Sequence, residues 1–265
     1  MSTYAQSVPG GVGRREQYSL AKILGIWALA AASMGILSWI VFPLLGLEFE
    51  SNPLGFGVTL LVVLTLGLVW LFVLSMIIVR REEGDLRWAT LKRRLRLNTP
   101  RDPTTGQPRA RLWLWVLPFI VAVAVIELLL NTPLENAWVS VFPFLAEPEG
   151  YSFDAILGSQ EILGRLVGAW WFFALFVVQA IFNTILGEEF LFRGVFGRWS
   201  WVANSVLFGL YHVHVPWVIP NAVPTGLLYT YPAYRYRSTW MSIILHSAQS
   251  VYFAFLVLGV VLELA

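Results

Sequence analysis

The sequence predicts an all-α protein, a polytopic bundle of membrane-spanning helices. Hydrophobic residues make up 57% of the 265 residues, whereas charged residues make up only 13%. Soluble domains carry about 25% charged residues, so this composition is typical of an integral membrane protein. The hydrophobic residues also fall into runs of about 20, the length that a helix needs to cross the hydrocarbon core of a bilayer. The chain has no cysteine, which excludes disulfides, thiolate nucleophiles and cysteine-bound metals.

Seven spans are predicted, with six and eight as the alternative counts. They cover residues 23–45, 54–79, 112–130, 165–190, 199–214, 217–233 and 239–262. The first run follows basic residues, as the core of a signal peptide would. It is longer than the 7–15 residues of such a core and has no clear cleavage site, so we expect it to remain as the first span. The fifth and sixth runs are short because prolines interrupt them, namely Pro216, Pro220 and Pro224.

Basic residues are concentrated on one side of the predicted bundle. Ten Lys and Arg residues lie between Arg80 and Arg111, and others precede the first span or follow the fourth and sixth. The loops on the other side are acidic and contain Glu48, Glu50, Glu135, Glu147, Glu149, Asp154 and Glu161. By the positive-inside rule, the N-terminus is then cytoplasmic and the C-terminus lies outside. We expect a multi-pass protein of the cell inner (plasma) membrane.

The chain is expected to consist of a flexible tail, residues 1–18, and one membrane domain, residues 19–265. Within the basic cytoplasmic loop, residues 80–111, the stretch 86–97 has the pattern of an amphipathic helix. Such a helix is expected to lie on an anionic lipid surface. A basic helix can also bind nucleic acid or a calmodulin-type partner. Its position between two spans favours membrane lipids, and no nucleic-acid partner is expected.

Two adjacent carboxylates and an arginine end the fourth hydrophobic run, in the sequence GEEFLFRG. Ionisable groups at membrane depth are costly, so they are kept where they are paired, hydrated or functional. On a helix, Glu189 and Arg193 are i,i+4 neighbours that can form an ion pair, whereas Glu188 points about 100° away. Glu189 is therefore expected to orient the site, and Glu188 to act as the general base.

Two histidines in the following runs are further candidates. Phe208 and His212 share one helix face at a spacing of four. His214 would lie about 200° from His212 on a helix, so only one of the two is expected to face the interior, and we choose His212. In the last run, His246 belongs to a polar stripe of spacing four with Ser238, Ser242 and Ser250. Serines in such a stripe commonly mediate helix contacts, whereas His246 is a candidate for catalysis.

These motifs together resemble the CPBP family of intramembrane glutamate endopeptidases, which includes type II CAAX prenyl endopeptidases and bacteriocin-processing proteins. The resemblance covers about residues 165–255 and follows the family patterns EExxxR, FxxxH and HxxxN or HxxxD. It implies a metal-independent and cofactor-free peptidase in which a glutamate activates water. It also implies that a membrane-associated peptide or protein, lipidated in some members, is the substrate. The implied catalytic residues are Glu188, Glu189, Arg193, His212, His246 and Ser250.

One position departs from the family pattern and leaves other functions open. Ser250 stands where the family has Asn or Asp, whose side chain is thought to help stabilise the oxyanion. Loss of one oxyanion donor can cost about 10²–10³ in rate, and Gln249 would replace it only from about 100° around the helix. An inactive membrane scaffold or assembly partner is therefore the alternative.

Two further hypotheses concern carboxylates in the spans. A zinc hydrolase would use Glu188, His212 and His246 as ligands, although the chain has no HExxH motif. Glu127, with Asn131 one turn later, is another carboxylate within a span. It is expected either to be functional or simply to be hydrated near the outer interface.

Overall fold

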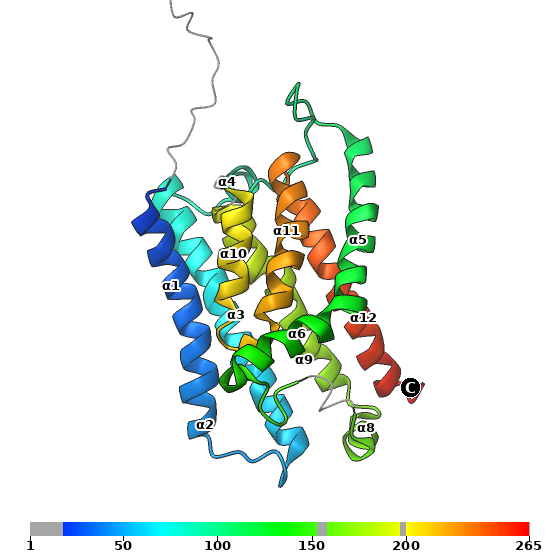
Figure 1. Ribbon diagram of the computed structural model, residues 1–265. Helices are drawn as coiled ribbons and strands as arrows, with labels where there is room; N and C mark the ends of the chain where they lie inside the picture. Colours follow the sequence, from blue (N-terminus) through cyan, green and yellow to red (C-terminus); the bar gives the residue numbers. More distant parts are fainter. Residues whose placement is uncertain (1–17, 153–157, 197–199, 265) are drawn as a thin grey trace, which may run out of the picture.

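The computed structural model describes residues 18–152, 158–196 and 200–264, and it is all-α within these ranges (Figure 1). Strands are absent from the described ranges. The predicted tail, residues 1–18, lies outside them except for Tyr18. The fold class predicted from composition and hydropathy is thus confirmed.

Five helical segments of the described chain are long and apolar enough to cross a membrane. The first consists of α1 (Leu20–Ile36), the π-helical η1 (Leu37–Val41) and α2 (Phe42–Leu44), and the second is α3 (Pro53–Glu83). The third joins η2 (Ala110–Trp115), α5 (Val116–Val125), η3 (Ile126–Leu130) and α6 (Asn131–Val141). The fourth joins α9 (Trp170–Ile181), η5 (Phe182–Gly187) and η6 (Glu189–Val195), and the fifth is α12 (Thr239–Val261). The shorter helices are α4 (Trp88–Arg94), η4 (Pro143–Leu145), α8 (Gln160–Leu166), α10 (Trp201–Tyr211), η7 (Pro216–Val218) and α11 (Ile219–Arg235).

The helices α10 and α11 correspond to the fifth and sixth predicted runs and are shorter than the five long segments. They lie side by side as a hairpin whose connection lies inside the bundle (Figure 1). With 11 residues, α10 is about 16 Å long, which is well short of a hydrocarbon core of about 30 Å. Gly209 permits the close approach of the pair, because a Cβ there would lie 2.3 Å from the Val223 side chain and 3.1 Å from its backbone nitrogen.

The two ends of the bundle differ in charge. We call the end that carries α4 and the loop of residues 80–111 the basic end, and the end that carries α2 and α8 the acidic end (Figure 1). The first helix begins at the basic end, and the C-terminus lies at the acidic end (Figure 1). This arrangement agrees with the odd number of spans that the charge pattern predicts.

The third long segment bends sharply between η3 and α6. The helix α5 runs along the bundle, whereas α6 turns across the face of α11 (Figure 1). Pro133 in the first turn of α6 lacks a backbone N–H and crowds the preceding turn, which accounts for the bend. The Trp138 indole donates a hydrogen bond of 3.1 Å to the Pro216 carbonyl and holds α6 against η7. The predicted span 112–130 therefore ends where the helix changes direction.

The basic loop differs from its predicted form. The helix α4 has only seven residues instead of the twelve predicted over 86–97. Trp88 is exposed, but Arg94, Leu95 and Leu97 are buried. The backbone leaves the helix here because Arg96 adopts a left-handed conformation, with φ of 56°. The C-terminal part of the predicted amphipathic helix thus packs into the bundle.

The core joins the fourth segment to α3, α10 and α12. Leu71, Leu191, Phe192, Tyr211 and Met241 are fully buried there. Gly187 brings the fourth segment close to α3, because a Cβ at this position would lie 2.8 Å from the Leu68 carbonyl oxygen. This contact fixes the depth of the two glutamates that follow Gly187.

Candidate active site

The two glutamates lie inside the bundle on a helix of unusual form. Glu188 is 2% exposed and Glu189 is 0% exposed. Both belong to a region where η5 and η6 form π-helical turns, which the sequence pattern did not predict. Such turns are rare and occur frequently at functional sites. The motif is therefore both buried and built on non-standard backbone.

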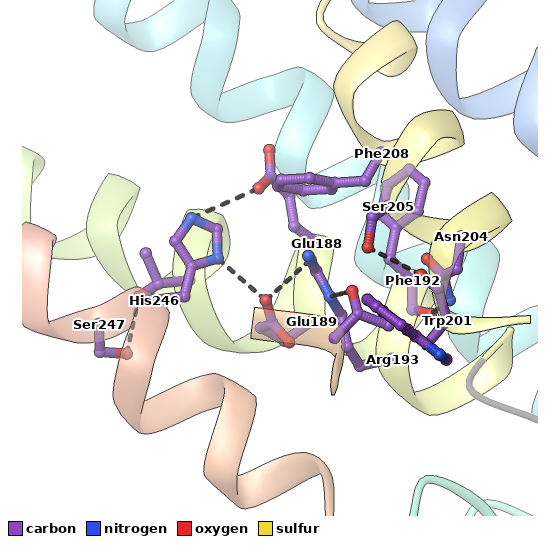
Figure 2. A network of polar contacts seen from close by, with 12 residues as sticks. Glu188, Glu189, Phe192, Arg193, Trp201, Asn204, Ser205, Phe208, His246 and Ser247 are labelled. Carbon is purple, nitrogen blue, oxygen red and sulfur yellow. Dashed lines mark hydrogen bonds and ion pairs between the residues drawn. The ribbon is translucent and has the colours of Figure 1, made fainter. Parts of the chain in front are cut away.

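Glu189 and Arg193 form the predicted i,i+4 ion pair. Arg193 Nη1 donates to Glu189 Oε1 at 2.9 Å, and both side chains are fully buried (Figure 2). Arg193 Nε donates to the Thr230 hydroxyl at 3.2 Å. The guanidinium also lies 4.0 Å from the centre of the Phe208 ring and 5.7 Å from that of Tyr229. The arginine is thus fixed by charge, hydrogen bonding and two aromatic faces.

His246 of α12 lies between the two carboxylates. Its Nδ1 is 3.0 Å from Glu189 Oε1, and its Nε2 is 3.8 Å from Glu188 Oε2 (Figure 2). The imidazole stacks on Tyr229 with a ring-centre distance of 4.7 Å. On the next residue of α12, the Ser247 hydroxyl lies 3.0 Å from that of Thr184. The position of His246 is therefore set by η6, α11 and η5 together.

His212 follows the last residue of α10, and its Nδ1 lies 2.9 Å from the Phe208 carbonyl oxygen. The Phe208 ring contacts both His212, at 4.9 Å, and His246, at 6.0 Å, between ring centres. The expected opposition of His212 and His214 is wrong, since their rings stack 5.5 Å apart. The helix ends at Tyr211, so a helical projection does not apply to the residues beyond it.

A cavity of about 390 Å³ connects these elements. Its lining includes Phe208, His212, Tyr229, His246 and Gln249. Ser250 lines a neighbouring cavity of about 290 Å³, which Gln249 also lines. The structure thus brings five of the six predicted site residues into one region, through the contacts of His246 and Phe208. It places Ser250 on the wall of the adjacent cavity.

Several residues of this region were not predicted from the sequence. Tyr211 is fully buried, its ring centre lies 5.1 Å from that of His212, and its hydroxyl has no hydrogen-bond partner among the described residues. Ser242 is fully buried one turn before His246, and Tyr229 stacks on His246. The only sequence signals are that Tyr211 precedes His212 and that Ser242 precedes His246 by four residues. The position of Tyr229 depends on the α10–α11 hairpin and has no local signal.

The basic loop holds the end of the motif helix. Arg96 Nη2 donates to the Arg193 carbonyl at 2.6 Å, and Arg94 Nη1 donates to the Gly194 carbonyl at 3.2 Å. Leu95 packs against Gly194, where a Cβ would lie 2.8 Å from the leucine side chain. These carbonyls lie at a helix end without intrahelical partners, so the arginines both satisfy and anchor them.

The donor groups are not arranged as a metal site in the part of the chain that the structure describes. No three His, Asp or Glu side chains are grouped closely enough there to hold a metal ion. Glu188, His212 and His246, the ligands that a zinc site would use, therefore do not form such a group.

The comparison with known proteins agrees with the motifs. Residues 168–252 match the family model described as type II CAAX prenyl endopeptidase Rce1-like. No curated protein and no solved structure matches the chain. The matched segment runs from the turn before α9 to the middle of α12 and includes all six predicted site residues. The match confirms the resemblance to the CAAX protease group.

Proposed function

We propose that this multi-pass membrane protein is an intramembrane endopeptidase in which Glu188 activates water. The proposal builds on the match of residues 168–252 to the Rce1-like CAAX protease model. The family match implies a membrane endopeptidase of the CAAX protease type. The finer proposal is a metal-independent hydrolysis of a peptide bond in a membrane-associated or lipidated substrate. The observation that carries it is the position of His246 between Glu188 and the ion-paired Glu189.

Glu188 is suited to be the general base because Arg193 is engaged by its neighbour. Arg193 makes its ion pair with Glu189, and Glu188 Oε2 has no hydrogen-bond partner among the described residues. A buried carboxylate oxygen without a partner is costly, and a water molecule would satisfy it. Such a water would lose its proton to Glu188 as it attacks the scissile carbonyl.

The histidines have complementary roles in this mechanism. If Nδ1 of His246 donates to Glu189, Nε2 points to the Glu188 side, and a protonated imidazole can there donate to the oxyanion. If Nδ1 of His212 donates to the Phe208 carbonyl, Nε2 is left as an acceptor. His212 can then share a proton of the attacking water. Arg193 keeps Glu189, and through it His246, in position.

The second oxyanion donor is the open part of this mechanism. Ser250 is one helical turn from His246, as the family pattern requires. Gln249 is three residues from His246 and carries an amide on the wall of the cavity that contains both histidines. Either side chain could donate a hydrogen bond to the oxyanion. The activities of variants with Ser250 or Gln249 replaced show which of the two is the donor.

The orientation and location follow from charge and are part of the proposal. His246 lies seven residues into α12, or about 11 Å from the basic end of that helix. If the basic end faces the cytoplasm, the site lies in the cytoplasmic half of the bilayer. A substrate would then be cleaved near the inner leaflet of the plasma membrane, where α4 contacts anionic lipid headgroups.

A cleavage assay with Glu188→Gln tests the proposal. The variant should fold and lack peptidase activity, whereas Glu161→Gln, an exposed change on α8, should retain it. Metal analysis of the purified protein tests the zinc alternative, since a stoichiometric metal that activity requires would contradict the proposed mechanism.

The second candidate is a catalytically inactive scaffold or assembly partner of the same fold. The observation that favours it is Ser250 at the position of the family Asn or Asp. A scaffold would retain its cellular role in the Glu188→Gln variant, whereas a protease would lose it.

A further inference from the structure

The cavity that contains His212 and His246 extends away from them to a group of carboxylates. Glu127, Glu135 and Glu147 line its other part, from η3, α6 and the segment after η4. The described residues that line this cavity include no Lys or Arg. A low-dielectric cavity whose charged lining is acidic concentrates the field and attracts cations.

Glu127 is the carboxylate of this group that lies deepest along a spanning helix. It is half-buried on η3, with Leu128, Leu129 and Leu130 directly after it. No Lys, Arg or His of the described chain lies within ion-pair distance of it, and its hydrogen bond is from Asn221 Nδ2 at 3.1 Å. An intramembrane carboxylate that lines a cavity and has no cationic side chain beside it is expected to bind a ligand.

Asn221 gives an independent indication of a ligand at the same place. The side chain lines the cavity and is 7% exposed. Its Nδ2 is used by Glu127, but its Oδ1 has no hydrogen-bond partner in the described structure. Glu127 and Asn221 therefore present acceptor oxygens to the cavity, and that of Asn221 has no donor among the described residues. A ligand that satisfies them must bring N–H groups and positive charge.

The same cavity also has aromatic walls. Tyr151 and Trp217 both line the cavity, and their ring centres are 6.3 Å apart in an edge-to-face contact. Aromatic faces stabilise guanidinium and ammonium groups that lose their water. The described Asp, Glu and His side chains form no group that could hold a metal ion, so the chemistry favours an organic cation.

We infer that the part of the cavity around Glu127 and Asn221 binds a basic side chain, the guanidinium of Arg or the ammonium of Lys, of the peptide substrate. The inference rests on the proposed function, because it takes the histidine part of the same cavity as the place of cleavage. The acidic part then selects peptides with a positive charge close to the scissile bond.

Thiol labelling tests this site without any need for hydrolysis. The chain has no cysteine, so Asn131→Cys introduces a single thiol on the cavity wall, one turn from Glu127. The reaction rates of a cationic and an anionic methanethiosulfonate of similar size are compared in the full-length protein. We expect the cationic reagent to react about tenfold faster, and Glu127→Gln to reduce this ratio several-fold. Ser140→Cys, exposed on the same helix, should show a ratio that Glu127→Gln does not change.

A protection experiment then identifies the ligand chemistry. N-acetyl-arginine amide should slow labelling of the thiol introduced by Asn131→Cys with a neutral reagent, and N-acetyl-citrulline amide should not. Glu127→Gln should weaken this protection. Glu135→Gln, which removes a charge from the same cavity without changing the partner of Asn221, should also weaken it. Equal protection by the two compounds, or a cation preference that survives both substitutions, would overturn the inference. Because labelling is independent of Glu188, these outcomes are distinct from a failure of the peptidase proposal.

Discussion

His246 and Glu189 share a hydrogen bond of 3.0 Å between Nδ1 and Oε1, although 57 residues separate them in the chain. The bond joins α12 to the π-helical turn η6 and directs His246 Nε2 toward Glu188. Glu189 therefore has two partners, His246 and Arg193, and cannot be removed without releasing both.

Replacement of Glu189 by Ala should destabilise the protein strongly. Arg193 is fully buried, and removal of one partner of a buried ion pair costs about 3–5 kcal/mol. Glu188→Gln keeps the size and the polarity of the side chain and should leave stability nearly unchanged. Thermal unfolding of the two variants in detergent measures the difference. Equal unfolding temperatures for Glu189→Ala and the unmodified protein would show that the pair does not hold the site.

Replacement of His246 by Gln should lower kcat by about 10²–10³, the cost of one oxyanion donor. The change in KM should be small, because the interaction is formed mainly in the transition state. His214→Gln is the matched control, since His214 stacks on His212 but makes no hydrogen bond or ion pair with Glu188 or Glu189 in the described structure. Steady-state kinetics on one substrate compare the two. A loss confined to KM would assign His246 to substrate binding instead.

The exchange Ser250→Asn should preserve or raise peptidase activity. An amide at this position is one turn from His246 and reaches further than a hydroxyl. Ser250→Ala should have little effect, because Ser250 lines the adjacent cavity, whereas Gln249→Ala should reduce kcat. If Ser250→Ala is as inactive as Glu188→Gln while Gln249→Ala is fully active, Ser250 is the donor and our view of Gln249 is wrong.

Gly187→Ala should destabilise the protein, although alanine is the better helix former. A Cβ at Gly187 would lie 2.5 Å from the Phe182 carbonyl oxygen and 2.8 Å from that of Leu68, and neither backbone atom can move aside easily. Gly25→Ala in α1 is the control, because nothing lies within 4 Å of its Cβ. There the change should be neutral or stabilise the helix by up to about 1 kcal/mol. Unfolding in detergent at equal protein concentration compares the stabilities of the two variants. Similar stability of Gly187→Ala and Gly25→Ala would refute the close contact at Gly187.

Much of the fold could be predicted because the bilayer imposes simple rules. Runs of about 20 apolar residues locate the spans, and the distribution of Lys and Arg separates the two ends. The ion pair of Glu189 with Arg193 was predicted because i,i+4 neighbours meet on a helix, and π-helical turns did not prevent the contact.

The sequence-based predictions that were wrong or incomplete also have specific physical causes. His212 and His214 stack because α10 ends at Tyr211, and no local signal marks that end. Gln249, at i+3 from His246, lines the histidine cavity, whereas the family pattern drew attention to i+4 and Ser250. The position of a cavity depends on the packing of several helices, which spacing within one helix does not define.

The most direct test of the central claim is a comparison of new peptide termini in membranes that contain the unmodified protein, Glu188→Gln or the surface variant Glu161→Gln. All three should accumulate to the same level in the membrane. We predict that one or more membrane-associated peptides show a cleaved terminus with the unmodified protein and with Glu161→Gln, and remain uncleaved with Glu188→Gln. The same termini at the same abundance in all three membranes would contradict hydrolysis by Glu188-activated water.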